Sequence, residues 1–346
     1  MLQPWLLQYQ PASQRTGAMP AGVFVSAAFL LVLLAAPLVF PLTVVNDLGQ
    51  AMSLGLLAIG FNVIFRYSGL LSFGHAAFFG FAAYAEAQLL LHFPGLPLLV
   101  LIPVVIAVSA LLGVVLGHVC VRRQGAYFSM MTLAIAAFLY SVAYKWHAVT
   151  GGTDGLDGFL PSRLALLPGW SIGQPGIAAT YWIVVTVVVV AASLAWALLE
   201  LTPFGNAVRA VCNNEERASF LGYDTHRIKL ANYILGAALA GAGGALWAID
   251  NRFVSTDSID LTLSTTVIIM TFIGGTGWFW GPLAGSIVYI AAGDWLSKIT
   301  PHWQLLLGAG FVAMVLAAPG GIAGVTLAGW RRLVRNVTTR RDDADV

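Results

Sequence analysis

The sequence predicts an all-α fold, a polytopic membrane helix bundle with about ten transmembrane helices. Two observations carry this prediction. Hydrophobic residues make up 59% of the 346 residues and charged residues only 9%, whereas about a quarter of the residues in a soluble domain are charged. The apolar residues also form long continuous runs without the alternation of a membrane barrel, and a helix of ~20 such residues can cross a bilayer. Membrane lipid is therefore the main solvent of this chain.

Prolines, glycines and basic residues separate the spans. Phe93–Pro97 is a predicted turn between the third and fourth spans, and Asp224 is the predicted N-cap of the seventh. The last three segments are short for a bilayer, so the number of spans depends on them. We expect the spans at residues 21–45, 48–65, 68–91, 98–119, 127–144, 179–199, 228–249, 263–273, 281–296 and 304–316.

Basic residues set the expected orientation of the bundle. With ten spans, 13 of the 17 Lys and Arg fall on one side of the membrane, which also holds both termini. Cytoplasmic loops are enriched in Lys and Arg, so this side is predicted to be cytoplasmic. The chain is then one transmembrane domain over residues 1–346, with cytoplasmic tails at 1–20 and 327–346, a periplasmic loop at 145–178 and a cytoplasmic loop at 201–226.

The cytoplasmic loop carries the pattern of two short helices. Thr202 before Pro203 is a typical helix start. Asn213 and Glu216 form a predicted capping box that starts a second helix, and Gly222 is a predicted terminator. One apolar face of the first helix is made by Phe204, Val208, Val211 and Cys212. The loop is either an amphipathic segment on the lipid headgroups or a docking element that passes force from a partner to the membrane helices.

Two stretches, residues 68–80 and 274–285, are rich in glycine and other small residues. Small residues let membrane helices pack closely, and this packing explains most of these glycines. Their density also predicts broken helices, which are tolerated at membrane depth only inside the protein or along a cavity. Transporters place binding sites and gates at such breaks. Both stretches are therefore candidate parts of a translocation pathway.

The chain carries no motif for chemistry of its own. No Walker-type phosphate loop, His-Glu-x-x-His or Gly-x-Ser-x-Gly motif occurs, and the six histidines and two cysteines are scattered. A net charge of +2 does not point to nucleic acid. A proton-coupled carrier needs a deep carboxylate, whereas Glu86 and Asp294 lie within about two turns of a span end, where we expect them to reach water. His75 is expected to be a hydrogen-bonded interior residue.

Four motifs resemble those of the branched-chain amino acid permease family of ABC importers. The first is the stretch Gly69–Gly80. The second is the cytoplasmic loop, in which Glu216-Arg217-Ala218 and Gly222 fit a Glu-Ala-Ala-x-x-x-Gly pattern, with Arg217 in place of the middle alanine. The third is Gly274-Gly275-Thr276-Gly277 with Gly281, Pro282 and Gly285. The fourth is Gly151-Gly152-Thr153-Asp154-Gly155-Leu156, which is closer to the second of the family's two permease subunits. The resemblance covers about residues 45–325.

The resemblance implies an ATP-driven importer of branched-chain or related amino acids in a bacterial inner membrane. The implied assembly has two homologous permease subunits, two cytoplasmic ATPases that bind ATP and Mg, and a periplasmic substrate-binding protein. No enzymatic activity and no cofactor are then expected on this chain. Phe204, Val208 and Val211 would seat in a groove of the ATPase. The other coupling residues would be Arg209, Glu215, Glu216, Arg217, Ala218 and Gly222.

The same resemblance implies a pathway that alternates between the two faces of the membrane. Its lining and gate would include Ser72, Gly74, His75, Gly80, Gly274, Gly275, Thr276 and Gly277. The periplasmic loop would contact the binding protein through Asp154, Asp157 and Arg163.

Four alternatives remain open from the sequence. A urea or short-amide permease of the same family, or an aromatic-acid importer on the same architecture, would share these motifs. An ion-coupled secondary carrier would need no ATPase but would need a buried carboxylate. A purely structural membrane subunit would tolerate substitutions in residues 68–80 without loss of transport.

Overall fold

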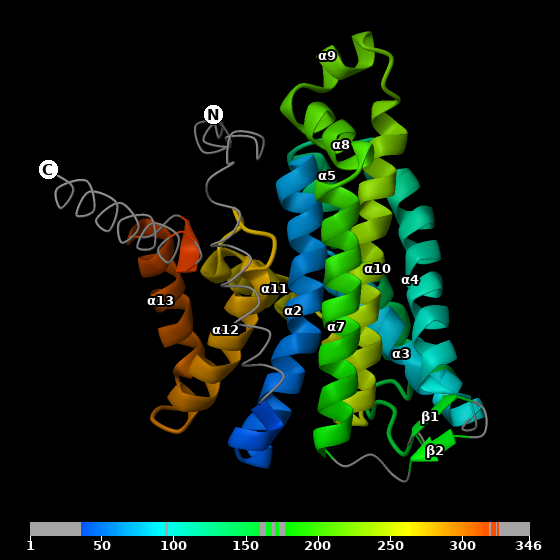
Figure 1. The fold of residues 1–346 in the computed structure, drawn as a ribbon, viewed down its shortest axis with the longest axis vertical. Helices are drawn as coiled ribbons and strands as arrows, with labels where there is room; N and C mark the ends of the chain where they lie inside the picture. The colour runs from blue at the N-terminus through cyan, green and yellow to red at the C-terminus, as the bar shows by residue number, and fades with distance from the viewer. Residues whose placement is uncertain are drawn as a thin grey trace, which may run out of the picture.

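The computed structural model describes residues 36–93, 96–159, 164–167, 170–172, 177–317, 320–322 and 324, which form a helical bundle (Figure 1). The longer helices are α2 (Leu42–Ser68), α3 (Ala76–His92), α4 (Leu98–Cys120), α5 (Ala126–Lys145), α7 (Ile177–Glu200), α10 (Thr225–Asn251), α11 (Leu261–Gly274), α12 (Gly281–Ser297) and α13 (Trp303–Ala317). The shorter ones are α6 (His147–Thr150), α8 (Pro203–Asn213), α9 (Glu215–Phe220) and the 3-10 turn η3 (Thr256–Ser258). Strands β1 (Leu164–Leu167) and β2 (Trp170–Ile172) pair antiparallel. The predicted helix bundle is confirmed, with a small hairpin added where a loop was expected.

Among the described residues, five helices are long and apolar enough to cross a membrane: α2, α4, α5, α7 and α10. Helices α11 and α13 are apolar but shorter. From α4 onward the predicted spans agree with the observed helices within three residues at each end. The count of ten spans stays a prediction, and the tails at 1–20 and 327–346 lie outside the described residues.

The first two predicted spans are wrong at their junction. Pro41 precedes a single helix, α2, that runs through the break expected at residues 46–47. Asn46 and Asp47 interrupt the apolar run, but both are only half-buried near the start of the helix, where polar side chains can be solvated. Residues 21–35 of the first predicted span lie outside the described residues.

Helices α2 and α10 cross at the centre of the bundle with their backbones in contact. A methyl group on Gly60 would lie 2.6 Å from the Gly236 carbonyl oxygen, and one on Gly243 would lie 2.5 Å from the Ser53 carbonyl oxygen. Close backbone approach of this kind drives helix association in lipid, where hydrophobic burial between helices contributes little. The small-residue stripe of α10 is therefore explained by packing.

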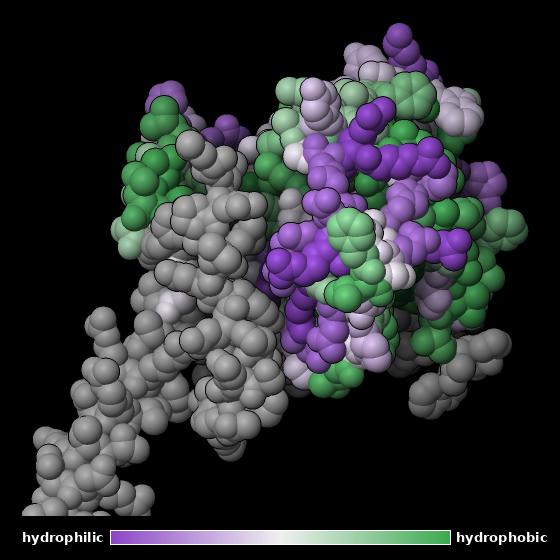
Figure 2. Space-filling view, turned by 90° about the horizontal axis from the view of Figure 1, so that it is seen from above, coloured by the Kyte–Doolittle hydropathy of each residue, from purple (hydrophilic) through white to green (hydrophobic). Residues whose placement is uncertain are grey.

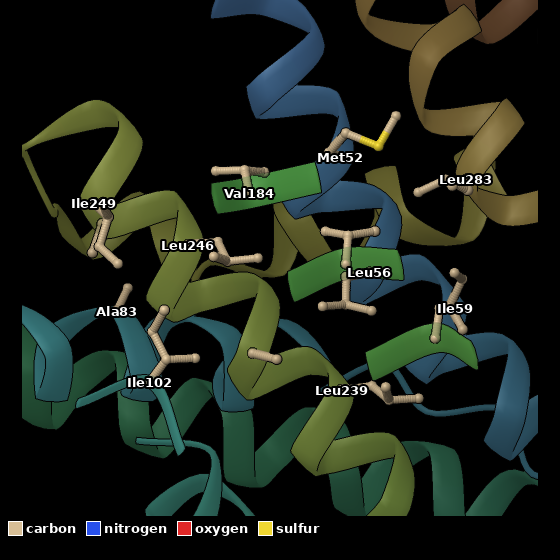
Figure 3. Close-up of a cluster of buried hydrophobic side chains, with 14 of the residues drawn as sticks. Met52, Leu56, Ile59, Ala83, Ile102, Val184, Leu239, Leu246, Ile249 and Leu283 are labelled. Atoms are coloured by element: carbon tan, nitrogen blue, oxygen red, sulfur yellow. The ribbon is translucent and has the colours of Figure 1, made fainter. Parts of the chain in front are cut away.

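Larger apolar side chains fill the space around this crossing. Figure 3 shows Met52 and Leu56 of α2 lying near Val184 of α7, with Leu239 and Leu246 of α10 in the same buried cluster. The cluster joins α2, α7 and α10 into one rigid unit, to which the elements at both ends are attached.

Two helices of the bundle begin only after an irregular segment. Helix α2 ends at Gly69, whose φ of 67° is left-handed, and residues 69–75 are irregular before α3. The third predicted span, residues 68–91, therefore becomes a helix only at Ala76, and the predicted break is confirmed. Residues 252–260 form a second irregular segment before α11, against which α3 packs: a methyl group on Gly80 would lie 2.2 Å from Ile259 Cγ1.

The ends of the bundle differ in charge. Helices α8 and α9 lie at one end, at the top in Figure 1, and the β1–β2 hairpin lies at the other. Arg66 at the end of α2, Arg122 and Arg123 after α4, and Arg227 at the start of α10 belong to elements that meet the α8–α9 end. This sorting agrees with the sequence-based orientation, which would make the α8–α9 end cytoplasmic.

Candidate functional site

Helix α8 lies across the ends of three bundle helices with its apolar face turned inward. It packs against α2, α7 and α10, and Val208 and Val211 are only 1% and 3% exposed. Phe204 is half-buried against the main core cluster. The predicted apolar face exists, but the chain's own helices cover it. Val208 and Val211 are therefore not free to enter an ATPase groove in this conformation, which corrects that part of the prediction.

A glycine allows α8 to approach α7 so closely. Gly205 is buried, and a methyl group there would lie 1.7 Å from the carbonyl oxygen of Leu199. Pro203 occupies the first turn, as predicted. Thr202 does not cap the helix as expected, since its hydroxyl donates to the Leu198 carbonyl instead.

A polar cluster, the α8 clamp, ties α8 to the ends of α2 and α7. It consists of Tyr67, Glu200 and Arg209. The Arg209 Nη2 atom is 2.6 Å from Glu200 Oε2 and donates to the Leu199 carbonyl at 3.1 Å. The Tyr67 hydroxyl donates to Glu200 Oε1 at 2.7 Å, and the Arg209 guanidinium lies 5.4 Å from the centre of the Tyr67 ring. The Arg209 and Glu200 side chains are 22% and 16% exposed, so the network is less screened than a surface pair. Arg209, a predicted coupling residue, thus contacts the chain's own helices α2 and α7.

Glu215 ties the second helix, α9, to the bundle. Its carboxylate accepts hydrogen bonds from Lys229 of α10 and from Gln124 in the turn before α5. Lys229 is only 5% exposed, and a buried ammonium group needs such a partner because its desolvation is costly.

Burial also raises the pKa of the Cys212 thiol on α8, an effect that the nearby Lys229 charge partly opposes.

The turn between the two helices depends on one side chain. Asn214 is the N-cap of α9, and its side-chain oxygen accepts from the Arg217 backbone N–H at 2.8 Å. This corrects the capping box predicted from Asn213 and Glu216, since Asn213 is the last residue of α8. The predicted cap of α10 is confirmed, because Asp224 accepts from the Arg227 backbone N–H at 3.1 Å.

The outer surface of α9 forms an exposed tip, which we name the α9 tip. Its members are Glu216, Arg217, Phe220, Leu221 and Tyr223. Phe220 is 84% and Leu221 73% exposed. Figure 2 looks onto this end of the molecule and shows hydrophobic groups among hydrophilic ones. The sequence interpretation missed Phe220, Leu221 and Tyr223, although three large apolar residues in so polar a stretch could have indicated a contact surface.

Gly222 and Ala218 shape this tip from within. Gly222 has a φ of 88° and is exposed, so it ends α9 as predicted. The backbone N–H of Tyr223 donates to the Ala218 carbonyl at 3.2 Å. Ala218 is buried, which leaves it a supporting residue of the tip and not part of its surface.

The first predicted pathway stretch is held by α5 and α11. The Phe73 backbone N–H donates to Thr132 Oγ1 at 3.2 Å, and the Ala76 backbone N–H donates to Ser264 Oγ at 3.2 Å. A methyl group on Gly74 would lie 2.2 Å from the Thr132 carbonyl oxygen. This close approach explains the glycine without requiring a pathway.

His75 lies in the same stretch, above the crossing of α2 and α10. It is completely buried between the rings of Phe61 and Phe78, with ring centres 6.2 and 5.7 Å away. Ser72 is buried as well. A buried imidazole beside a distorted segment fits both an interior packing residue and a gate residue.

The second predicted stretch forms the turn between α11 and α12. A methyl group on Gly274 would lie 1.9 Å from the Gly281 carbonyl oxygen, and Gly275 has a φ of 101°. Thr276 is half-buried and Gly277 is exposed. The turn needs its first two glycines for close contact, so their presence is explained by local structure.

At the opposite end of the bundle, Asp154 and Asp157 are exposed. They flank Leu156, whose backbone pairs with Val254 in an isolated β-bridge. Arg163, the third predicted contact for a binding protein, lies outside the described residues. Two of the three predicted side chains are thus available on this surface.

The position of Glu86 differs from the expectation that its side chain reaches water. The residue is completely buried on α3, and neither carboxylate oxygen has a hydrogen-bond partner among the described residues. The expectation that Glu86 reaches water near a span end is therefore wrong, because α3 packs against α10, α4, α5 and α11. Asp294 does reach the surface, where it pairs with Lys298 at 2.7 Å.

Within the described part of the chain, no group of three or more His, Cys, Asp or Glu is arranged to hold a metal ion. What the α8–α9 arrangement offers is mechanical: one helix is fixed to three spans, and the next presents a mixed apolar and charged tip.

Comparison with known proteins identifies relatives over most of the chain. The family model described as branched-chain amino acid transport system / permease component matches residues 43–327. The high-affinity branched-chain amino acid transport system permease protein LivM of Escherichia coli K12 is 27% identical over 78% of this chain and 68% of its own length. LivM of Salmonella typhimurium is 27% identical over 86% of this chain and 75% of its length.

A third relative comes from an archaeon. The probable branched-chain amino acid transport permease protein LivH of Methanocaldococcus jannaschii is 28% identical over 85% of this chain and 98% of its length. No significant match was found among solved structures.

Proposed function

Since the chain belongs to the branched-chain amino acid transport permease family, we propose that it is one of two homologous subunits of a pore that imports branched-chain or related amino acids. Its role as the membrane permease of an ABC importer follows from the family. The substrate is inferred from the printed names of the relatives, and the two LivM proteins among them favour the second of the two subunit types.

The partners and the orientation are part of the same proposal. The α8–α9 end faces the cytoplasm of a bacterium, where two ATPases hold ATP and Mg. The opposite end faces the periplasm, where Asp154 and Asp157 are placed to meet a substrate-binding protein. The excess of basic residues at the α8–α9 end supports this orientation.

The observation that carries the proposal is that the apolar face of α8 is buried against the bundle whereas the α9 tip is exposed. Coupling depends on this difference. The ATPase contacts the tip, where Phe220 and Leu221 act as apolar anchors and Glu216 and Arg217 fix the orientation. The buried face of α8 and the α8 clamp then transmit the movement to α2, α7 and α10. Glu215, through Lys229, adds a direct connection from α9 to α10.

Movement of α2, α7 and α10 changes the packing of the helices around the two irregular segments, residues 69–75 and 252–260. His75 lies beside the α2–α10 crossing, where it contacts Phe61 of α2. A tilt of either helix therefore shifts His75 and, with it, the segment that holds Ser72 and Gly74. Gly80 and the residues 274–277 complete the proposed gate. Alternating access by rocking of packed helices is a common solution in transporters.

Transport by a reconstituted assembly tests the function. Proteoliposomes that contain this chain, its partner permease and the ATPases should take up leucine under one condition only. ATP must be present on the side of the membrane that carries the ATPases, and the binding protein must be present on the opposite side. Changing Glu216 and Gly222 together should leave ATP hydrolysis in place and abolish uptake. Normal uptake by the double variant would refute the coupling assignment, and uptake of urea or an aromatic acid in preference to leucine would refute the substrate.

Glu86 favours a second candidate, an ion-coupled carrier, because such a carrier needs a buried carboxylate. The two functions differ in energy source. Uptake that persists without ATP, collapses with a protonophore and is lost in Glu86→Gln would establish the carrier. ATP-dependent uptake that Glu86→Gln retains would exclude it.

A further inference from the structure

A pocket opens between α2, α3, α10 and the segment before α11, at the end of the bundle away from α8 and α9. Its volume is about 340 Å³, within the range of small-molecule sites. Leu54, Phe79, Trp247, Phe253 and Leu263 supply its apolar wall. Asn251, Ser255, Asp257 and Ser258 supply its polar side. The pocket thus has an apolar wall from the bundle helices and a polar side from residues 251–258.

The polar side carries one negative charge and no positive one. Asp257 accepts a hydrogen bond from the Ser255 hydroxyl at 3.2 Å, and within the described residues it forms no ion pair. Asn251 is already engaged, since it accepts from Gln50 at 3.1 Å and donates to the Trp247 carbonyl at 3.1 Å. The carboxylate of Asp257 is therefore the group that can take a new cationic partner.

A buried hydroxyl lies on α3, the helix that packs against this segment. Tyr84 is 6% exposed, and its hydroxyl has no hydrogen-bond partner among the described residues. It is near enough to Asp257 for an electrostatic interaction. Tyr84 follows Gly80 by one helical turn on α3, and Gly80 packs against Ser258 and Ile259, so both residues share the face of α3 that meets this segment. An unsatisfied buried hydroxyl is unfavourable unless a ligand or water supplies its partner.

The chemistry of the wall selects the ligand. An ammonium group needs hydrogen-bond acceptors and a negative charge. Asp257 supplies the charge, and the hydroxyl groups of Ser255 and Ser258 in the pocket wall can supply further acceptors. An aliphatic side chain fits the surface of Leu54, Phe79 and Leu263. None of the described residues that line the pocket is Lys or Arg, so these residues offer a substrate carboxylate no counter-charge.

We propose that this pocket is an entry site that holds an aliphatic amino acid by its ammonium group and its side chain. Asp257 is the partner of the ammonium group, and the pocket does not bind the substrate carboxylate. The inference rests on the proposed function, because it places the imported substrate on this chain. It adds that the permease itself selects for the amine, next to Gly80 of the proposed gate, which packs against Ser258.

Photolabelling of the assembled importer without its binding protein tests the site. The probe is a leucine analogue with a diazirine in the side chain, and the labelled peptides are mapped by mass spectrometry. Labelling should concentrate in residues 247–263 and should fall about tenfold or more in Asp257→Asn, which removes the charged partner. Asp257→Glu, which keeps the charge, should restore most of the labelling. Asp294→Asn, which changes an exposed acid outside the pocket, is the matched control and should label as the wild type does.

Competition separates recognition of the amine from recognition of the acid. Leucinamide should compete with the probe as well as leucine does, whereas 4-methylpentanoate, which lacks the ammonium group, should compete at least tenfold less well. Equal labelling in Asp257→Asn, labelling confined to other segments, or equal competition by 4-methylpentanoate would each overturn the proposal. An assembly that imports leucine with ATP but gives one of these results keeps the proposed function and lacks this site. A wild-type assembly that imports no leucine refutes the proposed function itself.

Discussion

Helices α8 and α9 are separated by Asn214 alone, yet they relate to the bundle in opposite ways. In α8 the apolar residues Val208 and Val211 are buried against α2, α7 and α10. In α9 and the turn after it, Phe220 and Leu221 are exposed. The difference shows that the apolar face of an amphipathic helix identifies a contact but does not identify the partner. Here one helix belongs to the permease, and the next is left for another protein.

The largest effect is expected from a substitution that displaces α8 from the bundle. Gly205→Ala places a methyl group 1.7 Å from the Leu199 carbonyl oxygen, and because both sides are backbone, α8 has to move. We expect a loss of about 3 kcal/mol in stability and no ATP-driven uptake. Thermal unfolding in detergent and uptake in proteoliposomes measure the two effects.

The matched control is Gly222→Ala at the end of α9. Nothing lies within 4 Å of a methyl group there, but the φ of 88° is strained for alanine, so we expect a loss of only about 1 kcal/mol. Equal destabilisation by the two alanines would mean that α8 is not seated as described.

The second effect concerns the α9 tip. Phe220→Ala together with Leu221→Ala should weaken ATPase binding by about 2 kcal/mol or more, roughly thirtyfold, because exposed apolar anchors contribute most at an interface. The melting temperature of the free permease should not change, since both side chains are exposed. Binding of the ATPase to the permease in nanodiscs measures the loss. Leu111→Ala, another exposed apolar residue but on α4, serves as the control and should bind normally.

The third effect concerns the α8 clamp. Arg209→Ala leaves Glu200 partly buried without its cation, and we expect a loss of about 2 kcal/mol in stability with weakened coupling. A double-mutant cycle with Glu200→Gln should show that the two changes are not additive. Additive changes would mean that Arg209 acts independently of Glu200.

The smallest effect is a shift in reactivity with pH. Burial raises the pKa of the Cys212 thiol, and the thiolate is the reactive form. In a Cys120→Ser background, maleimide labelling of Cys212 should therefore rise at higher pH than labelling of an exposed cysteine placed by Phe220→Cys in a Cys120→Ser, Cys212→Ser background. The same pH profile at both positions would show that burial does not raise the pKa of the Cys212 thiol.

Much of this arrangement could be predicted from local sequence. Pro203 marked the start of α8, Gly222 the end of α9 and Asp224 the cap of α10, because each acts through its own backbone or that of its neighbours. The irregular segment after Gly69 was predictable for the same reason. The roles assigned to the coupling and gate residues remain predictions.

The features that sequence reasoning missed depend on distant neighbours. Val208 is covered by helices that lie elsewhere in the chain, and Glu86 is buried because other helices enclose α3. Asn214 displaced Asn213 as the cap because seating α8 extended that helix by one residue. The sequence period shows which residues share a face, but tertiary packing decides what that face meets.

Labelling of two cysteine positions tests the central claim most directly. Val208→Cys and Phe220→Cys are each placed in a chain without Cys120 and Cys212, and a membrane-impermeant maleimide is added at the cytoplasmic side with and without the ATPases. We predict that Phe220→Cys reacts readily and becomes protected at least tenfold by the ATPases, while Val208→Cys reacts slowly in both cases. A Val208→Cys that is reactive alone and protected by the ATPases, or a Phe220→Cys that reacts only from the other side of the membrane, would contradict the account.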